Sequence, residues 1–223
     1  MRVVIPNFLD EEMLSYYLSH YNEDETPKFD KFPWKENPVV PNKHHTEYYI
    51  QYYDKVDDRK YIDYFLQRVN AHFDVARYKL RASIMRSMQI GGRSQWHSDD
   101  TPKLKEEVLS ITINLNKEWD LSWGGLYLFE QEDNKQFYIP KFNEANCVLS
   151  PIKHSVSTID KEAKAPRNSL QLWFYRPIEE ENKTYNPELI EEIFAKPVPQ
   201  YTYSPPRVEE VVIKPKNTWV NRG

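Results

Sequence analysis

The chain has little cysteine and little glycine. It contains one cysteine among 223 residues, Cys147, so it can form no internal disulfide and no zinc site built from cysteines. Because Cys147 lies in a short apolar run, we expect a small buried side chain and not a nucleophile. Only 5 glycines stand against 16 prolines, so the pairs Gly91-Gly92 and Gly124-Gly125 predict strand ends or tight bends.

The chain also lacks a strong net charge and a long apolar segment. A formal charge of −4 gives no electrostatic attraction to nucleic acid or to an anionic membrane. No stretch approaches the roughly 18 apolar residues of a membrane span, and the apolar part of the N-terminus is too short for a secretory signal. We therefore expect a cytoplasmic protein with no nucleic-acid partner and no membrane partner.

The first third of the chain has the residue spacing of helices. Apolar side chains recur at helical intervals after Asp10 and again over residues 58–73. The polar, proline-rich segment 22–43 between them predicts a loop. A composition of 39% hydrophobic and 29% charged residues suits one sizeable globular core.

From about residue 77 the pattern changes to that of strands. Short apolar runs alternate with charged or turn-like stretches, which predicts an all-β barrel or sandwich. We predict one domain over 1–195, with a helical part over about 1–76 and a β-barrel core over about 77–176. A short helix is expected at 187–194, and an extended proline-rich tail over 196–223. The apolar runs cover 82–90, 108–115, 126–129, 136–139, 147–149, 155–159 and 169–175.

Histidine followed two positions later by a carboxylate occurs three times. Six histidines and 34 acidic residues in a chain of 223 would produce roughly one such match by chance, so the pattern alone proves nothing. Structural context has to distinguish the three pairs. They are His45 with Glu47, His72 with Asp74, and His97 with Asp99.

Two of the pairs are poor candidates for a metal site. His72 and Asp74 fall at the end of the second predicted helix, where residues two apart point to nearly opposite sides. His45 and Glu47 follow the proline-rich loop and have His44 beside them, which favours a polar surface patch.

The third pair follows the predicted strand at 82–90. In extended backbone the side chains of His97 and Asp99 face the same way, so both would point to one interior position. A structural hydrogen bond between them explains this pair equally well. His154 lies at the start of a later apolar run, and Arg167 opens the last one. A cation inside a barrel needs an anionic partner, and a bound dicarboxylate would supply one because arginine binds carboxylates through two hydrogen bonds.

These residues together resemble the prolyl-4-hydroxylase-like branch of the iron(II)/2-oxoglutarate oxygenases. The family motif of His-x-Asp, a distal His and then a basic residue reads here as His97-Ser98-Asp99, His154 and Arg167. The resemblance covers about residues 7–175, with Met88 where members often carry a tyrosine. Further matching segments are Leu115-Asn116 with Trp119 and 124–128, Asn143 with 148–156, and Ser169 with Trp173-Phe174.

The resemblance implies a double-stranded β-helix core, also called a jelly-roll or cupin-like barrel, with flanking N-terminal helices. His97, Asp99 and His154 would bind Fe(2+) and leave positions open for 2-oxoglutarate and O2. Arg167 would bind the far carboxylate of 2-oxoglutarate, with Ser169 as a hydrogen-bond donor beside it. The reaction would hydroxylate a C–H bond and release succinate and CO2, with ascorbate as an auxiliary reductant.

By analogy with this branch we expect a peptidyl substrate, prolyl included, or an amino-acid-like small molecule. Whether Arg86, Arg93, Trp96 or Trp123 contacts it is left open. Two other functions fit the same residues: a cupin-like hydrolase or isomerase that uses zinc or manganese, and a non-catalytic binding protein. The tail carries too many apolar residues for a solvated linker, so we expect it to dock on the barrel or on a second subunit, as in a homodimer.

Overall fold

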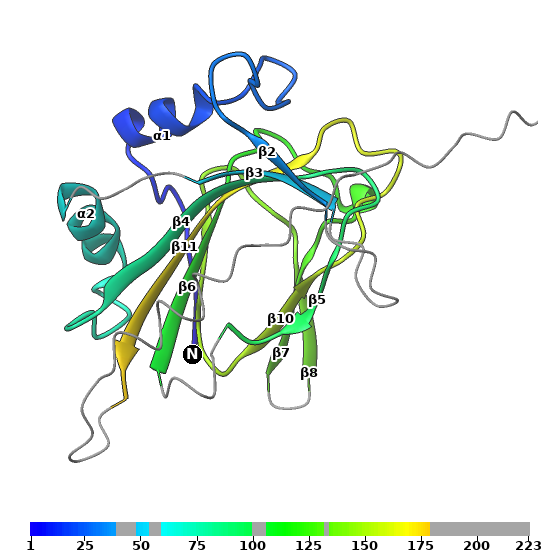
Figure 1. The fold of residues 1–223 in the computed structure, drawn as a ribbon. Coiled ribbons are helices and arrows are strands. Elements are labelled where there is room, and N and C mark those ends of the chain that lie inside the picture. The colour runs from blue at the N-terminus through cyan, green and yellow to red at the C-terminus, as the bar shows by residue number, and fades with distance from the viewer. Residues whose placement is uncertain (39–47, 54–58, 100–105, 132–133, 179–223) are drawn as a thin grey trace, which may run out of the picture.

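Two antiparallel β-sheets face each other and form the body of the molecule (Figure 1). The computed structural model describes residues 1–38, 48–53, 59–99, 106–131 and 134–178. In spatial order, the larger sheet consists of β1 (Arg2–Ile5), β9 (Ala145–Leu149), β6 (Glu106–Asn114), β11 (Arg167–Pro177), β4 (Lys79–Met88), β3 (Tyr48–Tyr53) and β2 (Lys35–Pro38). The smaller sheet consists of β5 (Ser94–His97), β10 (Lys153–Val156), β7 (Tyr127–Gln131) and β8 (Asn134–Tyr138).

Two α-helices and a short 3-10 helix accompany the sheets. They are α1 (Glu11–Leu18), α2 (Arg59–Val69) and η1 (Leu121–Trp123). The first begins as predicted, because the Asp10 carboxylate accepts a hydrogen bond from the Met13 amide and caps the helix. The second ends at Val69, before the expected residue 73, so His72 lies in the turn that follows and not on a helix. Among the described residues, no helix is both long and apolar enough to cross a membrane.

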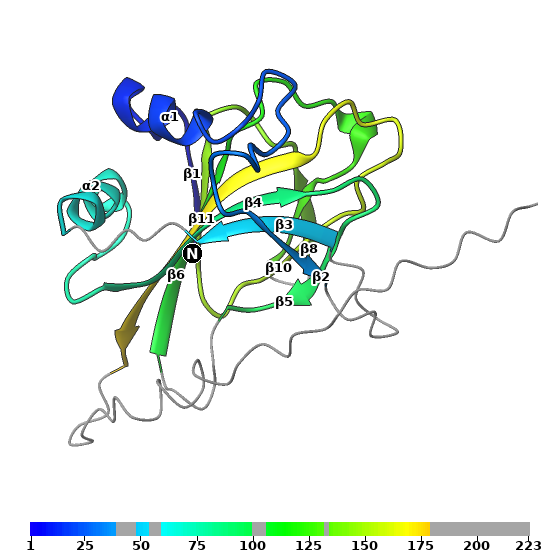
Figure 2. The ribbon, with the colours of Figure 1, turned by 45° about the horizontal axis from the view of Figure 1, so that its top comes forward.

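The main core lies between the larger sheet and the two helices (Figure 2). Alternation along the strands separates the two faces of that sheet. On β6, Ile111 and Ile113 belong to the core on the helical side, and on α2 the fully buried Phe65 joins them. Ser110 and Thr112, which alternate with them on β6, line the space between the two sheets. The expected mainly-β fold with flanking helices is confirmed, and a second, smaller apolar cluster that includes Tyr127, Phe129 and Val156 lies on the side of the smaller sheet.

The residue patterns did not predict three strands in the first third of the chain. β1, β2 and β3 all add to the edges of the larger sheet, and β2 lies inside the segment expected to be a loop. Two of them have four residues each, too few to establish a period. The conformation of β1 also depends on a partner far along the chain, since Val3 pairs with Cys147. Three predicted features lie outside the described residues: the polar patch at 44–47, the helix at 187–194 and the tail at 196–223.

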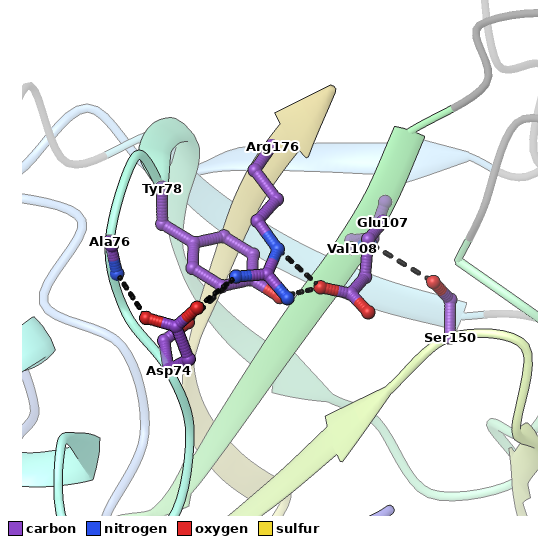
Figure 3. A network of polar contacts seen from close by, with 7 residues as sticks. All are labelled: Asp74, Ala76, Tyr78, Glu107, Val108, Ser150 and Arg176. Atoms are coloured by element: carbon purple, nitrogen blue, oxygen red, sulfur yellow. Dashed lines mark hydrogen bonds and ion pairs between the residues drawn. The ribbon is translucent and has the colours of Figure 1, made fainter. Parts of the chain in front are cut away.

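A polar network holds the far end of β11 (Figure 3). Arg176 donates from Nε to Glu107 on β6 over 2.6 Å and from an Nη atom to the Asp74 carboxylate over 3.0 Å. The Tyr78 hydroxyl donates to the same Glu107 oxygen over 2.6 Å. These contacts tie β11 to β6 and to the connection between α2 and β4. Asp74 thus serves this network and is not part of the group of described residues that could hold a metal.

Candidate metal centre

Three side chains, two from neighbouring strands and one from the bend that follows β5, meet at the β5 edge of the smaller sheet. His97 is the last residue of β5 and lies directly opposite His154 on β10. Asp99 follows in a bend, so the expectation that extended backbone would carry both His97 and Asp99 is wrong in detail. The bend still turns the carboxylate inward. The ligand atoms of the three residues all lie within 4.8 Å of one another, the one such group among the described residues.

The two imidazole rings are oriented by their own backbone. The Nδ1 atom of His97 lies 2.7 Å from the carbonyl oxygen of Gln95, and that of His154 lies 3.2 Å from the carbonyl oxygen of Ile152. A hydrogen bond there requires a proton on Nδ1, which leaves the Nε2 electron pair of the neutral ring available. Both Nε2 atoms face Asp99, at 3.5 Å from His97 and 3.3 Å from His154.

Asp99 is held as a carboxylate. Burial opposes its charge, but contacts with His154 and His97 and a short hydrogen bond donated by the Ser110 hydroxyl outweigh burial and hold the pKa of Asp99 well below its usual value. In the neutral tautomer that carries its proton on Nδ1, each ring would offer a metal its Nε2 electron pair, beside one anionic oxygen of Asp99. This donor set suits a divalent transition metal such as iron(II), zinc or manganese, so the residues present fit the metal that the motif implies.

A cavity of about 330 Å³ opens beside the three residues. It lies between the two sheets, and polar and aromatic side chains line it. The ring of Tyr127 stacks on that of His154, with centroids 5.6 Å apart and planes within 8°. The lining consists of Arg86, Met88, 94–97, Asp99, 110–112, Tyr127, His154, Val156 and 171–173.

Arg167 is a buried cation behind this lining. The residue is 1% exposed, and one Nη atom donates to Asn114 over 3.2 Å. Among the described residues, the Nε atom has no hydrogen-bond partner and no carboxylate forms an ion pair with the guanidinium. Burial lowers the pKa of Arg167 to about 10, and the charge of Arg86 adds to that effect, so it stays protonated at neutral pH. Its guanidinium lies 5.9 Å from the centroid of the Tyr127 ring.

The two glycine pairs occupy bends, as predicted. Gly91 has a φ of +82° between β4 and β5, and Gly124 and Gly125 have φ values of +63° and +60° before β7. A Cβ on Gly125 would lie 2.9 Å from the Trp119 ring and 3.2 Å from Cδ of Arg167. Gly125 therefore leaves the space that the buried arginine occupies.

The remaining candidate residues differ in whether they line the cavity, lie exposed or are buried elsewhere. Arg86 and Trp96 line the cavity, whereas Arg93 is exposed and Trp123, which does not line it, packs edge-to-face on Trp119. Ser169 is buried, 1% exposed, and does not line the cavity. Sequence reasoning missed Ser110, Thr112 and Tyr127. The alternation of polar and apolar residues over 110–114 was the available signal, because it gives β6 a polar inner face.

Comparison by sequence finds one family. Residues 75–175 match the model of the 2OG-Fe(II) oxygenase superfamily, a segment that includes the three clustered residues and Arg167. No curated protein matches the chain at a significant level.

Solved structures share the fold at low sequence identity. A prolyl-4-hydroxylase from Pseudomonas putida matches with a TM-score of 0.60 and 16% identity, over 78% of this chain and 92% of that chain. A prolyl hydroxylase from Trichoplax adhaerens, in complex with a hypoxia inducible factor peptide fragment, matches with 0.58 and 16%, over 78% and 83%. The viral collagen prolyl hydroxylase of Paramecium Bursaria Chlorella virus-1 matches with 0.55 and 12%, over 79% and 96%. The expected double-stranded β-helix fold is confirmed.

Proposed function

We propose that the chain is an oxidoreductase of the 2OG-Fe(II) oxygenase superfamily, whose model matches residues 75–175, and that His97, Asp99 and His154 are its iron ligands. The observation that carries this proposal is the convergence of two imidazole Nε2 atoms and one carboxylate beside an open cavity. Three ligands on one side of a metal leave positions for a co-substrate and for O2.

Bound iron(II), with 2-oxoglutarate and O2, supplies an oxidative decarboxylation that hydroxylates a C–H bond and releases succinate and CO2. The residues of the chain bind and orient the participants. The backbone carbonyls that accept from the two Nδ1 atoms keep each ring turned to the metal position. The Ser110 hydroxyl does the same for Asp99 by donating to one of its two oxygens.

Arg167 is the proposed anchor for the far carboxylate of 2-oxoglutarate. Its burial without an acidic partner among the described residues supports this role, because an isolated buried cation is costly and a dicarboxylate would compensate it. Tyr127 connects the two ends of the site, since its ring lies between the guanidinium and the ring of His154. Ser169 stays our predicted hydrogen-bond donor to the same carboxylate.

The proposed substrate is a peptide, prolyl residues included, or an amino-acid-like molecule. The support is that several structures with this fold are prolyl hydroxylases, one of them with a peptide fragment bound. The cavity beside the metal position is open and lined by Trp96 and Trp173, which suits an extended substrate that presents one side chain to the metal.

Succinate formation is the direct test. The full chain is incubated with iron(II), ascorbate, air and 2-oxoglutarate, with and without prolyl peptides. We expect succinate even without a peptide, because enzymes of this kind turn over slowly when uncoupled. Absence of 2-oxoglutarate consumption under all these conditions would sink the proposal and favour a cupin-like hydrolase or isomerase, or a binding protein.

A further inference from the structure

Glu25 has a backbone conformation that glutamate rarely adopts. It lies in the turn that follows α1, inside the segment 22–43 that the sequence predicts as a loop, and its φ is +62°. A residue with a Cβ disfavours this left-handed region, which glycine would occupy at lower cost. A glutamate at this position indicates that its side chain makes contacts that compensate the cost.

The Glu25 carboxylate accepts two hydrogen bonds from the connection between β6 and η1. One oxygen accepts from Nδ2 of Asn116 over 2.6 Å, and the other accepts from the backbone amide of Lys117 over 2.8 Å. The backbone carbonyl of Glu25 accepts a third hydrogen bond, from Nδ2 of Asn168 on β11 over 2.7 Å. Glu25 therefore joins the turn after α1 to segments that lie 91 and 143 residues further along the chain.

Asn116 extends this contact to the backbone on both sides of Arg167. β6 ends at Asn114, and beyond it the Asn116 side chain takes the place of strand backbone. Its Oδ1 atom accepts from the amide of Asn168 over 2.6 Å, and its Nδ2 atom donates to the carbonyl of Pro166 over 2.9 Å. One side-chain amide, in a residue that is 3% exposed, thus holds the peptide groups that flank the buried arginine.

Glu25 fixes which way the Asn116 amide is turned. A carboxylate can only accept hydrogen bonds, so Asn116 has to present its NH2 group to Glu25. That orientation leaves Oδ1 of Asn116 directed at the amide of Asn168. The opposite orientation would bring Oδ1 against the carboxylate of Glu25 and leave the Asn168 amide facing a donor. The carboxylate therefore stabilises the orientation that holds β11 at its start.

The guanidinium of Arg167 depends on this backbone for its position. The side chain donates from one Nη atom to Asn114, and its Nε atom has no hydrogen-bond partner among the described residues. With few polar contacts of its own, the side chain is placed mainly by the Cα atom from which it extends. A contact between a guanidinium and a carboxylate through two hydrogen bonds tolerates little displacement.

We propose that Glu25 is a positioning residue for the co-substrate anchor: it orients the amide of Asn116, which fixes the backbone of Arg167 and with it the guanidinium. The inference rests on the proposed oxygenase function and gives a role to a turn that none of the matching family motifs includes. Glu25 does not line the cavity beside the metal position, so it acts through Asn116 and not by touching a substrate.

The test measures the backbone and the co-substrate separately. In the metal-free full chain, hydrogen exchange of the Asn168 amide reports on its bond to Asn116, with the amide of Leu172 further along β11 as the internal reference. In the chain with iron(II) and without oxygen, the visible charge-transfer band is titrated with 2-oxoglutarate and, separately, with iron(II). Urea unfolding gives the folding stability of each variant.

Glu25→Ala should raise the dissociation constant of 2-oxoglutarate about tenfold, which corresponds to about 1.4 kcal/mol, and leave the iron(II) affinity unchanged. The Asn168 amide should exchange faster relative to that of Leu172. Glu25→Gly loses the same carboxylate but tolerates the positive φ, so it should be more stable than Glu25→Ala and yet bind 2-oxoglutarate as weakly. Glu23→Ala is the matched control: it removes an exposed carboxylate from the same loop and should behave as the wild type.

A double variant tests the route through Asn116. If Glu25 acts only by orienting that amide, Glu25→Ala combined with Asn116→Ala should bind 2-oxoglutarate no more weakly than Asn116→Ala alone. Losses that add in the double variant would mean that Glu25 affects the anchor by another route, which would overturn the inference.

Other results would also overturn it. Wild-type 2-oxoglutarate affinity in Glu25→Ala would mean that the carboxylate only attaches the loop. A 2-oxoglutarate effect that follows the stability difference between the alanine and glycine variants would trace it to general destabilisation. Unchanged exchange of the Asn168 amide in Glu25→Ala would refute the coupling and leave the oxygenase function intact. Absence of the band in the wild type would instead refute the proposed function itself.

Discussion

His97 and His154 lie directly opposite each other across the antiparallel pairing of β5 with β10, with ring centroids 4.4 Å apart. Both rings turn the same nitrogen toward Asp99 because each presents its Nδ1 atom to a backbone carbonyl. The geometry of the candidate metal site therefore depends on the register of one short strand pair. A slip by one residue would separate the two imidazoles.

Replacing any of the three proposed ligands should abolish iron binding. Anaerobic iron(II) with 2-oxoglutarate should give a weak visible charge-transfer band in the wild type. His97→Ala, Asp99→Ala and His154→Ala should each lose it while the circular dichroism spectrum stays native. His72→Ala is the control and should keep the band, since its side chain is exposed and outside the cluster. Loss of the band in His45→Ala, with retention in His97→Ala, would show that the wrong motif was chosen.

Arg167→Ala should raise the 2-oxoglutarate requirement steeply. Removing one partner of a buried charge pair costs roughly 2–5 kcal/mol, or about thirtyfold to several thousandfold in affinity. Iron affinity should change little, because Arg167 does not touch the three ligands. Titration of the charge-transfer band with 2-oxoglutarate measures the 2-oxoglutarate requirement, and titration with iron(II) measures the iron affinity. An unchanged 2-oxoglutarate dependence would remove Arg167 from the site.

Gly125→Ala should displace Arg167, the proposed anchor for 2-oxoglutarate, indirectly. The new Cβ would lie 3.2 Å from Cδ of Arg167 at a φ of +60°, so strain and crowding together should cost about 2–4 kcal/mol of folding stability. The 2-oxoglutarate requirement should also rise as the arginine shifts. Gly91→Ala is the matched control: its φ is +82° and nothing lies within 4 Å, so it should lose only about 1 kcal/mol, measured by urea unfolding.

Ser110→Ala should weaken metal binding without affecting the 2-oxoglutarate anchor. The hydroxyl donates to Asp99, and groups that orient metal ligands typically account for about 10- to 100-fold in affinity. Competition against a chelator measures the change. Ser110→Thr keeps the hydroxyl and should restore most of the affinity. If Thr and Ala behave alike, the hydrogen bond does not position the ligand.

Cys147 should be unreactive in the folded protein. It is fully buried, and burial raises the pKa of the thiol to about 12. Labelling by a thiol reagent at pH 8 should therefore be slow in buffer and fast in urea. Because the folded pKa lies above the unfolded value of about 8.5, the unfolded chain loses the proton first, so folding stability should fall as the pH rises above about 8.5. Fast labelling of the native protein would mean that β9 opens readily.

Much of the fold could be read from local patterns. The helix after Asp10 and most of the strands from β4 to β11 follow from residue spacing, because burial on one face forces periodicity. The edge strands β1 and β2, and β3 beside β2, could not be read, since short strands take their conformation from their partners. The end of α2 was misplaced for a similar reason: the turn at His72 interrupts an apolar pattern that continues to Phe73.

By itself, the sequence determined the residue types that can bind a metal and a dicarboxylate, and their order along the chain matched one family. Tertiary structure decided which of them meet. His97 and His154 come together because β5 pairs with β10, and the polar inner face of β6 becomes a cavity wall because a second sheet covers it. Contacts between residues far apart in the chain depend on register and packing, which local spacing does not encode.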